Sequence, residues 1–181
     1  MNKYMNKRVK FLMLLSLIIL GVLSMSFLLK PDYAKSAVDF KIKNAGIGVT
    51  GSFKKFETTI EFNESAKAPS SIKTTIEVET IDTGIEARDK HLRKEEYFNA
   101  DTYPVITFVS TQILKTTSGS FIAEGKLTIK GVTKEVKIPF TYINSIFQGT
   151  LSLNRRDYNV GGSSITMSDD VEAILKVAII K

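Results

Sequence analysis

The sequence contains no cysteine, no tryptophan and a single histidine, His91. Without cysteine, the chain can form no disulfide, no thiolate metal site and no thiol nucleophile. One histidine also excludes a metal centre built from several histidines. The sequence has no phosphate-binding glycine loop, dinucleotide-binding fingerprint, zinc motif or G-x-S-x-G nucleophile elbow. We therefore predict no metal, no cofactor and no catalytic residue.

The positive charge of the chain is concentrated at its start. The 181 residues include 25 basic and 19 acidic side chains, a formal net charge of +6. No acid precedes Asp32, whereas five basic residues lie within the first thirty, namely Lys3, Lys7, Arg8, Lys10 and Lys30. Residues 31–181 carry 20 basic and 19 acidic residues, a net +1. This near-neutral body argues against a nucleic-acid partner.

An apolar run of 19 residues, Phe11–Leu29, follows the basic stretch. A basic segment before an apolar one is the layout of a secretory signal peptide, and 19 residues are close to the roughly 20 that span a bilayer. Ala34-Lys35-Ser36 offers a small-x-small cleavage site. Residues 1–36 are therefore expected to be a signal peptide, or a membrane anchor through residues 11–29. Either way, the body is exported to the periplasm or another extracytoplasmic compartment.

From Val38 onward, apolar residues alternate with polar ones. Ser71–Thr80 and Phe121–Lys130 show the pattern clearly, and a period of two predicts strands with one buried face. About eight or nine such strands follow one another. One-sided burial and short connections such as Thr117–Ser120 favour antiparallel hairpins. An up-and-down barrel and a sandwich both fit, and a closed barrel of eight strands has an interior able to hold one ligand.

One segment departs from this alternation. Thr83-Gly84-Ile85-Glu86 has the spacing of a capping box and predicts a helix that continues to Arg93. Glu86 precedes Lys90 by four residues, a favourable helical pair. Glu95–Ala100 is expected to form a second short turn of helix.

The apolar stripes of the strands predict the interior of the barrel. They combine phenylalanines with small residues such as Gly51, Ala123 and Ala173, a mixture that leaves space between flat apolar walls and favours a long apolar ligand. The predicted lining comprises Phe40, Ile42, Val49, Phe53, Ile60, Phe62, Ile76, Phe108, Phe121, Leu127, Phe140, Leu151 and Leu175.

Few polar side chains are candidates for chemistry. His91 stands two residues after Asp89, and an Asp can orient a His for general-base work. On a helix, however, residues two apart point to different faces, so a structural role for His91 is favoured. The guanidinium of Arg155 suits a phosphate or carboxylate. It could equally form an ion pair with Asp157 or another acid that ties the strand end to a loop.

Several strings together resemble the YceI-like family. They are FKIKNAGIGVTGSFKKFE (40–57), IDTGIEARDKHLRKEEYFNADTYPVITFVST (81–111), GKLTIKGVTKEV (125–136) and NRRDYNV (154–160). The resemblance covers about residues 38–180. It implies an exported bacterial protein with a lipocalin-like antiparallel barrel, and a polyisoprenoid or other long-chain amphiphile bound inside that barrel.

The family motifs map onto individual positions. Arg88, Asp89, His91 and Leu92 match an RDxHL segment, Phe98 matches one residue of an aromatic pair, and Arg155 matches the arginine of an N-R-x-D-aromatic element. Asn44 stands where the family commonly has histidine, so a head-group contact at that place is not carried over. Asn159 replaces a usual glycine and can keep the same left-handed turn.

The sequence thus predicts an all-β, eight-stranded antiparallel lipocalin-like up-and-down barrel over 38–181, with one or two short helices at about 84–100 and an N-terminal apolar leader helix. The expected function is lipid binding for carriage, storage or stress protection. Candidate head-group contacts are Arg88, His91 and Arg155. The expected ligand is a long-chain isoprenoid or fatty amphiphile. The chain would also contact the membrane if the leader is uncleaved, and a homodimer is a further option. Two alternatives stay open: an enzyme using His91 and Asp89 on a lipid-like substrate, and a filled-barrel interaction domain.

Overall fold

The computed structural model describes residues 27–64 and 70–180, and within them one sheet contains eleven strands. Every paired strand runs antiparallel to its neighbour, in the order β1-β4-β5-β7-β8-β9-β10-β11-β2-β3-β6. The elements are β1 (Phe27–Leu29), β2 (Pro31–Asn44), β3 (Ile47–Phe53), β4 (Phe56–Phe62), β5 (Ser71–Glu77), η1 (Val78–Thr80), β6 (Ile81–Asp82), α2 (Glu86–Arg93), β7 (Val105–Lys115), β8 (Phe121–Ile129), β9 (Val132–Ile143), β10 (Ile146–Asn154), η2 (Arg155–Tyr158) and β11 (Met167–Ile179).

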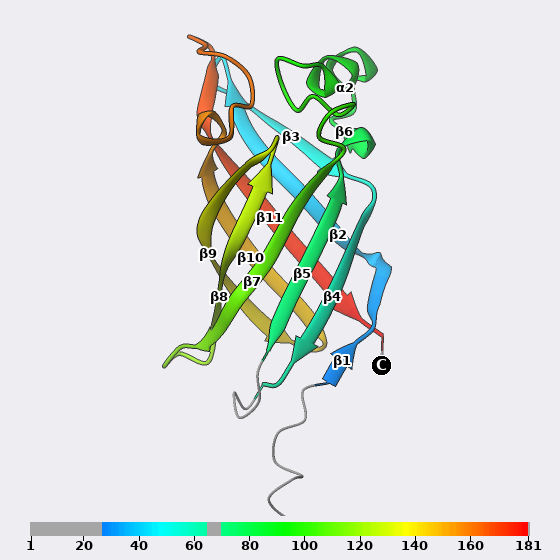
Figure 1. Ribbon diagram of the computed structural model, residues 1–181, viewed down its shortest axis with the longest axis vertical. Helices are drawn as coiled ribbons and strands as arrows, with labels where there is room; N and C mark the ends of the chain where they lie inside the picture. The colour runs from blue at the N-terminus through cyan, green and yellow to red at the C-terminus, as the bar shows by residue number, and fades with distance from the viewer. Residues whose placement is uncertain (1–26, 65–69, 181) are drawn as a thin grey trace, which may run out of the picture.

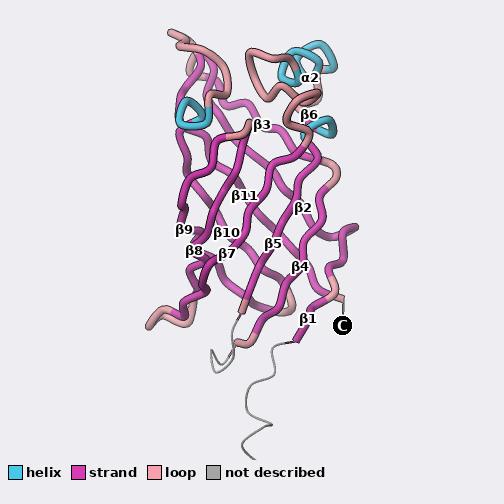
Figure 2. The backbone as a smooth tube through the Cα atoms, in the orientation of Figure 1, coloured by secondary structure: helices cyan, strands magenta, loops and turns pink. Residues whose placement is uncertain are grey.

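The sheet curls into a half-barrel with two distinct ends (Figure 1). We call the end that carries α2 and the β2–β3 hairpin the upper end. The opposite end, which carries the β7–β8 hairpin and strand β1, is the lower end. Figure 2 shows that the helical segments are confined to the upper end, whereas the wall consists of strands. Helix α2 therefore contributes to one rim of the half-barrel and not to its wall.

Alternation along the strands produces the buried interior. Strand β4 is buried at every second residue from Phe56 to Phe62, and β8 follows the same pattern from Phe121 to Ile129. The inward side chains form a single cluster of buried residues that contains seven phenylalanines. The predicted all-β, antiparallel architecture is confirmed. The turn between β8 and β9 is tight, because Lys130 and Gly131 both adopt the positive φ of a two-residue hairpin turn.

The predicted count of eight strands is wrong, because the structure contains eleven. Two of the extra strands, β1 and β6, are only three and two residues long. The other nine match segments of alternating residues in the sequence, with separate strands at Ile47–Phe53 and at Thr58–Phe62, and the chain between those two strands is interrupted at Lys54-Lys55. Phe53 and Phe56 are both buried although they stand three positions apart in the chain. A continuous strand would point them to opposite faces, so the strand must break.

The predicted helix is present as α2, but its predicted capping box is wrong. Helix α2 begins at Glu86, its N-cap residue is Ile85, and no side chain caps it. The Thr83 hydroxyl donates instead to the carboxylate of Asp89. The Glu86–Lys90 pair does form, with 2.7 Å between carboxylate oxygen and ammonium nitrogen. The second helical segment, Glu95–Ala100, consists of hydrogen-bonded turns.

The start of the described chain is part of the sheet. Residues Phe27–Leu29 pair with β4, and Pro31 and Asp32 pair with β11. The expected cleavage site after Ser36 therefore falls inside β2. The predicted leader helix lies outside the described residues, apart from Phe27–Leu29, which form β1. Within the described residues, no helix has the length and apolar character needed to cross a membrane.

Candidate ligand-binding site

A cavity of about 270 Å³ lies inside the curled sheet. Inward side chains from β2, β3, β4, β5, β7, β8, β9, β10 and β11 form its wall, and α2 contributes Arg88 and Leu92 at the upper end. The cavity is lined mainly by aliphatic and aromatic side chains. Its volume is near the lower end of the range of about 300–1,000 Å³ typical of ligand pockets, which suits a slender apolar molecule.

Most of the predicted lining residues face this cavity. Phe62 and Phe121 are the two that do not border it. Their side chains are nevertheless inward and buried, at 4 % and 3 % exposure. The eleven predicted residues that do line the cavity are Phe40, Ile42, Val49, Phe53, Ile60, Ile76, Phe108, Leu127, Phe140, Leu151 and Leu175.

Phe62 and Phe121 belong to an aromatic cluster that closes the lower end. The ring centroid of Phe62 lies 5.1 Å from that of Phe121, 5.2 Å from Tyr142 and 5.0 Å from Phe147, in edge-to-face contacts. Such geometry is favourable for aromatic rings. We call this cluster, with Phe140, the aromatic floor. It blocks the cavity below.

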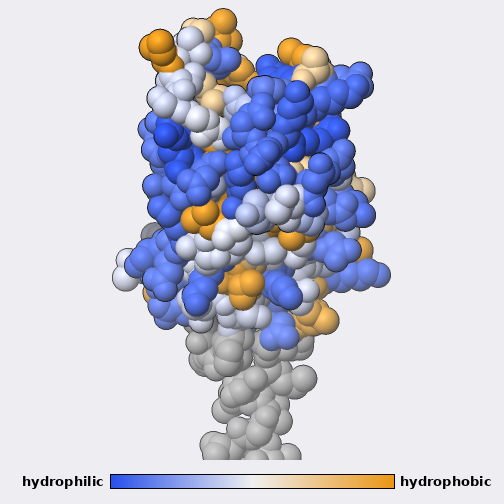
Figure 3. Space-filling view, turned by 45° about the horizontal axis from the view of Figure 1, so that its top comes forward, coloured by the Kyte–Doolittle hydropathy of each residue, from blue (hydrophilic) through white to orange (hydrophobic). Residues whose placement is uncertain are grey.

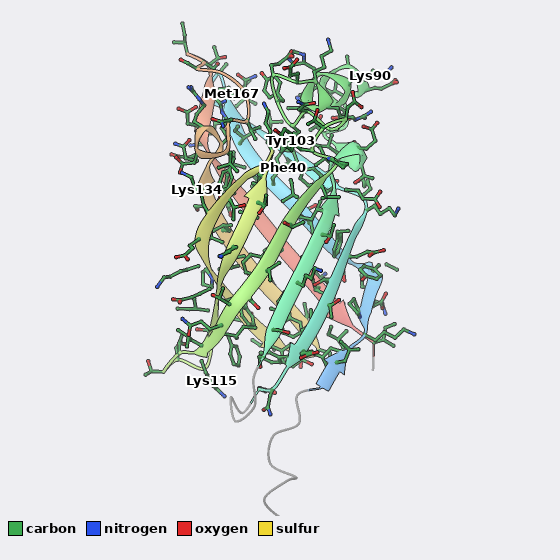
Figure 4. All side chains as sticks on the ribbon, viewed as in Figure 1. Phe40, Lys90, Tyr103, Lys115, Lys134 and Met167 are labelled. Carbon is green, nitrogen blue, oxygen red and sulfur yellow. The ribbon has the colours of Figure 1, made fainter. Side chains whose placement is uncertain are left out.

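Because the aromatic floor fills the lower end, we infer that the cavity opens at the upper end, and we call that end the mouth. Among the lining residues, Asn44 ends β2, Thr83 and Arg88 flank the start of α2, and Met167 begins β11. Figure 4 shows Met167 at the upper end and Lys115 at the lower end. Lys115 ends β7, and the β7–β8 hairpin joins it to the floor residue Phe121. The cavity has one closed apolar end and one end bordered by polar groups.

Small residues do not all enlarge the cavity. A Cβ atom on Gly51 would lie 2.3 Å from the Phe40 ring, which crosses directly over this position. The glycine thus makes room for an aromatic side chain, and the Phe40 ring lies 5.7 Å from that of Phe53. The expectation that Gly51 leaves free space is wrong, because Phe40 fills that space.

Polar atoms in the wall satisfy one another. Thr58 on β4 and Thr74 on β5 face each other in the sheet register, and their hydroxyl oxygens are 2.9 Å apart in a hydrogen bond. Thr58 is only 6 % exposed. Because the two hydroxyls bond to each other, neither is left unsatisfied in the apolar wall. Neither therefore needs a hydrogen bond from a ligand.

Arg88 is held at the mouth by the loop before α2. Its Nε donates to the Thr83 hydroxyl at 2.7 Å, and its Nη2 donates to the Thr83 carbonyl at 2.8 Å. Thr83 is itself fixed by the buried carboxylate of Asp89, which accepts from the Thr83 backbone N–H at 2.9 Å. Arg88 borders the cavity, and its Nη1 is not engaged by any described residue.

Among the described arginines, Arg155 donates the most hydrogen bonds. It is 4 % exposed, and its Nη2 contacts the Asp169 carboxylate at 2.6 Å. Its Nε and Nη1 donate to the carbonyls of Ser168, Val160 and Gly162, each at 2.9 Å. Of the two roles that the sequence leaves open for Arg155, the structure shows the ion pair, with Asp169 as the acid. Asp157 pairs with Lys134 instead. Arg155 borders the cavity, but its hydrogen bonds and its ion pair mainly hold the loop that precedes β11.

His91 does not border the cavity. Its side chain is half exposed, its Nδ1 lies 3.5 Å from the Glu96 carboxylate, and its ring packs edge-on against Tyr97. Asp89 is buried on another face of α2, as the spacing of two residues predicts. No hydrogen bond joins Asp89 to His91 in the described chain, so the acid–base pair needed for the enzyme alternative is not assembled.

Burial changes the pKa of two groups near the mouth. Burial lowers the pKa of Lys130, although the nearby Glu95 and Glu96 carboxylates oppose this change. Its ammonium donates to the carbonyls of Glu95 and Asn159 at 2.7 and 2.8 Å, joining the turn after α2 to the end of η2. Burial, and then the charge of Asp157, raise the pKa of Tyr158, which lines the cavity as a neutral phenol.

Sequence reasoning overlooked several wall residues. Thr58 and Thr74 occupy inward positions of β4 and β5, as the period of two indicates, but the predicted lining named only apolar residues. Tyr97 and Tyr158 also line the cavity. They come from a turn and from η2, and no strand periodicity identifies such residues.

The sequence matches the model of the YceI-like domain family over residues 29–179. The UPF0312 protein of Pectobacterium atrosepticum is 32% identical over 151 residues, covering 77% of this chain and 78% of that protein. A UPF0312 protein of Pseudomonas aeruginosa is 31% identical with the same coverage.

Three solved structures share the fold. BcnA of Burkholderia cenocepacia superposes with a TM-score of 0.79 and 30% identity, over 84% of this chain and 100% of that one. The YceI protein of Campylobacter jejuni gives 0.64 and 27% identity, over 74% and 85%. A polyisoprenoid-binding domain from Saccharophagus degradans gives 0.60 over 83% and 97%, and its 17% identity supports the fold alone.

Proposed function

The chain belongs to the YceI-like family, and on that premise we propose that it is an exported binding protein that holds a polyisoprenoid or a similar long-chain amphiphile in a lipocalin-like barrel. The observation that carries this proposal is the cavity, which is walled by apolar side chains and closed below by the aromatic floor. A filled barrel would leave no such space, so the cavity also argues against the interaction-domain alternative.

The two different ends of the cavity support one orientation for the ligand. The hydrocarbon chain would lie against the strands with its end at the floor, because burying each CH₂ group contributes about 0.8 kcal/mol. The polar head would remain at the mouth, where no described residue engages Nη1 of Arg88. Arg155 would support the head group only indirectly, by holding its loop, and His91 would take no part.

Export is the second part of the proposal. The basic segment and apolar run that precede Phe27 would direct the chain across the cytoplasmic membrane, where the leader is either removed or kept as an anchor. Because β1 and the first residues of β2 pair with β4 and β11, processing would leave residues 27–36 attached to the barrel. A binding role without catalysis agrees with the separation of Asp89 from His91.

A lipid-retention experiment tests the proposal. Native mass spectrometry of protein purified from its own host should reveal a bound hydrophobic molecule. The variant Ala173→Phe, which places a ring in the cavity wall, should lose it. Thr150→Phe is the matched control, because Thr150 is exposed on neighbouring β10. A protein that neither carries nor takes up any long-chain amphiphile, with the cavity intact, would contradict the proposed function.

A further inference from the structure

Three isoleucines stand exposed around the mouth, on three different segments. Ile47 begins β3 and is 70 % exposed, Ile85 precedes α2 and is 53 % exposed, and Ile165, in the loop before β11, is fully exposed. We call these three residues the mouth rim. Each is close in the chain to a residue that lines the cavity: Asn44 pairs with Ile47, and Thr83 and Met167 each lie two residues from a rim residue.

Hydrogen bonds fix these side chains in their exposed positions. The Ser164 hydroxyl accepts from the backbone N–H groups of Thr166 and Met167 at 3.2 and 3.0 Å. The Ala45 N–H donates to the Thr166 carbonyl at 2.8 Å, which joins the β2–β3 hairpin to the loop that carries Ile165. These hydrogen bonds hold the backbone on either side of Ile165 and at the β2–β3 hairpin in an arrangement that leaves Ile165 and Ile47 exposed.

The backbone of Ile85 is fixed in the same way. Its carbonyl accepts from the N–H groups of Arg88 and Asp89, each at 3.0 Å. The buried Asp89 carboxylate holds Thr83 on the other side. Space-filling shows hydrophobic residues at the top of the molecule in two groups, one on each side of a gap (Figure 3). Apolar side chains held in water around an opening favour contact with another apolar phase.

Charged residues at the upper end indicate what kind of apolar phase the mouth rim contacts. Lys43, on the β2–β3 hairpin, and Lys94, at the end of α2, are exposed. Neither forms an ion pair with an acid in the described parts of the chain. Exposed ammonium groups at the same end of the molecule as the three isoleucines match an anionic bilayer, in which headgroups attract the lysines and hydrocarbon accepts the isoleucines.

We propose that the mouth rim docks the protein onto an anionic lipid bilayer, so that a hydrocarbon chain passes between membrane and cavity without crossing water. This inference rests on the proposed function, because it assigns the route by which the cavity is filled. Exposed apolar residues also occur at the lower end, among them Leu28, Ile143 and Ile180. Those residues lie beyond the aromatic floor and surround no opening, so docking there would give a chain no path.

The absence of cysteine makes a site-specific test simple. Ile165→Cys places a single fluorophore on the rim, and Ile143→Cys places the same fluorophore at the lower end. The protein is used as its host makes it. Where a hydrophobic leader is retained, the protein is first held in lipid nanodiscs, so that the leader cannot insert into vesicles added later. Those vesicles consist of phosphatidylethanolamine and phosphatidylglycerol with a spin-labelled quenching lipid.

The rim label should be quenched by the added vesicles, and the Ile143→Cys label should not. Replacing Ile47, Ile85 and Ile165 by serine should weaken vesicle binding by on the order of tenfold for each isoleucine that enters the hydrocarbon. Equal quenching of both labels, quenching of the lower label alone, or no quenching of either would overturn the inference. Native mass spectrometry of the protein with all three isoleucines intact separates the two proposals. Retained lipid without vesicle contact contradicts docking only, whereas vesicle contact by a protein that never carries lipid contradicts the proposed function.

Discussion

The Tyr33 hydroxyl, on β2, accepts a hydrogen bond from the Thr58 backbone N–H of β4 at 3.1 Å and donates to the Thr58 carbonyl at 3.5 Å. Strands β2 and β4 are not neighbours in the sheet order. A side chain therefore takes the place of a strand at this position, and satisfies a backbone edge that would otherwise be open. The Tyr33 ring also packs edge-on against Phe56, with centroids 5.5 Å apart.

Removing this hydroxyl should destabilise the protein. Tyr33→Phe keeps the ring contact with Phe56 but leaves the Thr58 N–H and carbonyl without their partner. We expect the free energy of unfolding in urea to fall by about 1–2 kcal/mol. Tyr103→Phe is the control, because the described chain offers the Tyr103 hydroxyl no hydrogen-bond partner. Equal stability of Tyr33→Phe and the unmodified protein would show that the edge needs no such bond.

Arg155 should be essential for stability although it lies beside the cavity. Arg155→Met would leave the Asp169 carboxylate and three backbone carbonyls without their donor. We expect the free energy of unfolding to fall by about 2–4 kcal/mol. Arg156→Met changes the adjacent, exposed arginine and should alter stability by no more than about 0.5 kcal/mol. If the first variant kept full stability but lost lipid, Arg155 would be a head-group contact and not a clamp.

The two candidates of the enzyme alternative should behave differently when replaced. Asp89→Ala removes the acceptor that holds Thr83 and should lower stability by about 1–3 kcal/mol, with a looser mouth and faster loss of lipid. His91→Ala should leave both stability and lipid retention unchanged, because His91 is half exposed and outside the cavity. Urea unfolding and native mass spectrometry measure the two effects. Conversion of a lipid-like substrate that stops in His91→Ala would support the enzyme instead.

Acid should weaken the loop that precedes α2. The backbone N–H of Gly84, followed by the Lys54 ammonium, holds the pKa of Asp82 below its usual value of 3.8. A carboxylate with a lowered pKa stabilises the folded state above its ordinary pKa, and this contribution disappears as the pH falls through the folded-state value. Asp82→Asn should therefore flatten the pH dependence of thermal stability below about pH 4. If the thermal stability of both proteins fell equally with acid, Asp82 would contribute nothing to this pH dependence.

Residues 27–36 should remain on the exported protein. A chain shortened to begin at residue 37 would lack β1, Tyr33 and the Ser36 hydroxyl, which accepts from the Ala178 N–H at 3.0 Å. We expect it to unfold at a lower urea concentration than a chain beginning at Phe27. The intact mass of protein purified from its host should correspond to a first residue at or before Phe27. A stable, lipid-bearing product that begins after Ser36 would contradict this expectation.

Strand periodicity predicted which face of the sheet each residue occupies, but not the position of that residue along the axis of the barrel. The alternation in Phe121–Ile129 correctly turned Phe121 inward, and the same rule turned Phe62 inward. Whether such a ring borders the cavity or lies in the floor depends on the stagger between strands that are distant in sequence. That stagger is set by hairpins and bulges, such as the irregularity at Ser110/Gln112 on β7, which a single strand does not encode.

Other features were within reach of the sequence. The three-residue spacing of Phe53 and Phe56 breaks the period of two and indicates the interruption between β3 and β4. The capping box failed for a different reason. Thr83 and Glu86 have the correct local spacing, but the buried Asp89 offers Thr83 a charged acceptor, and charge-assisted hydrogen bonds are stronger than neutral ones. The choice depends on which carboxylate the fold buries.

The entry of the chain at the lower end has a geometric consequence. Strand β11 has 13 residues, about 43 Å of extended chain, and the tilt of strands in a barrel reduces its height along the axis to about 30 Å. If the leader stays embedded after export, the lower end of the barrel, with the aromatic floor, faces the membrane that holds the leader. The mouth then faces away from the anchoring membrane, within reach of a second lipid surface opposite.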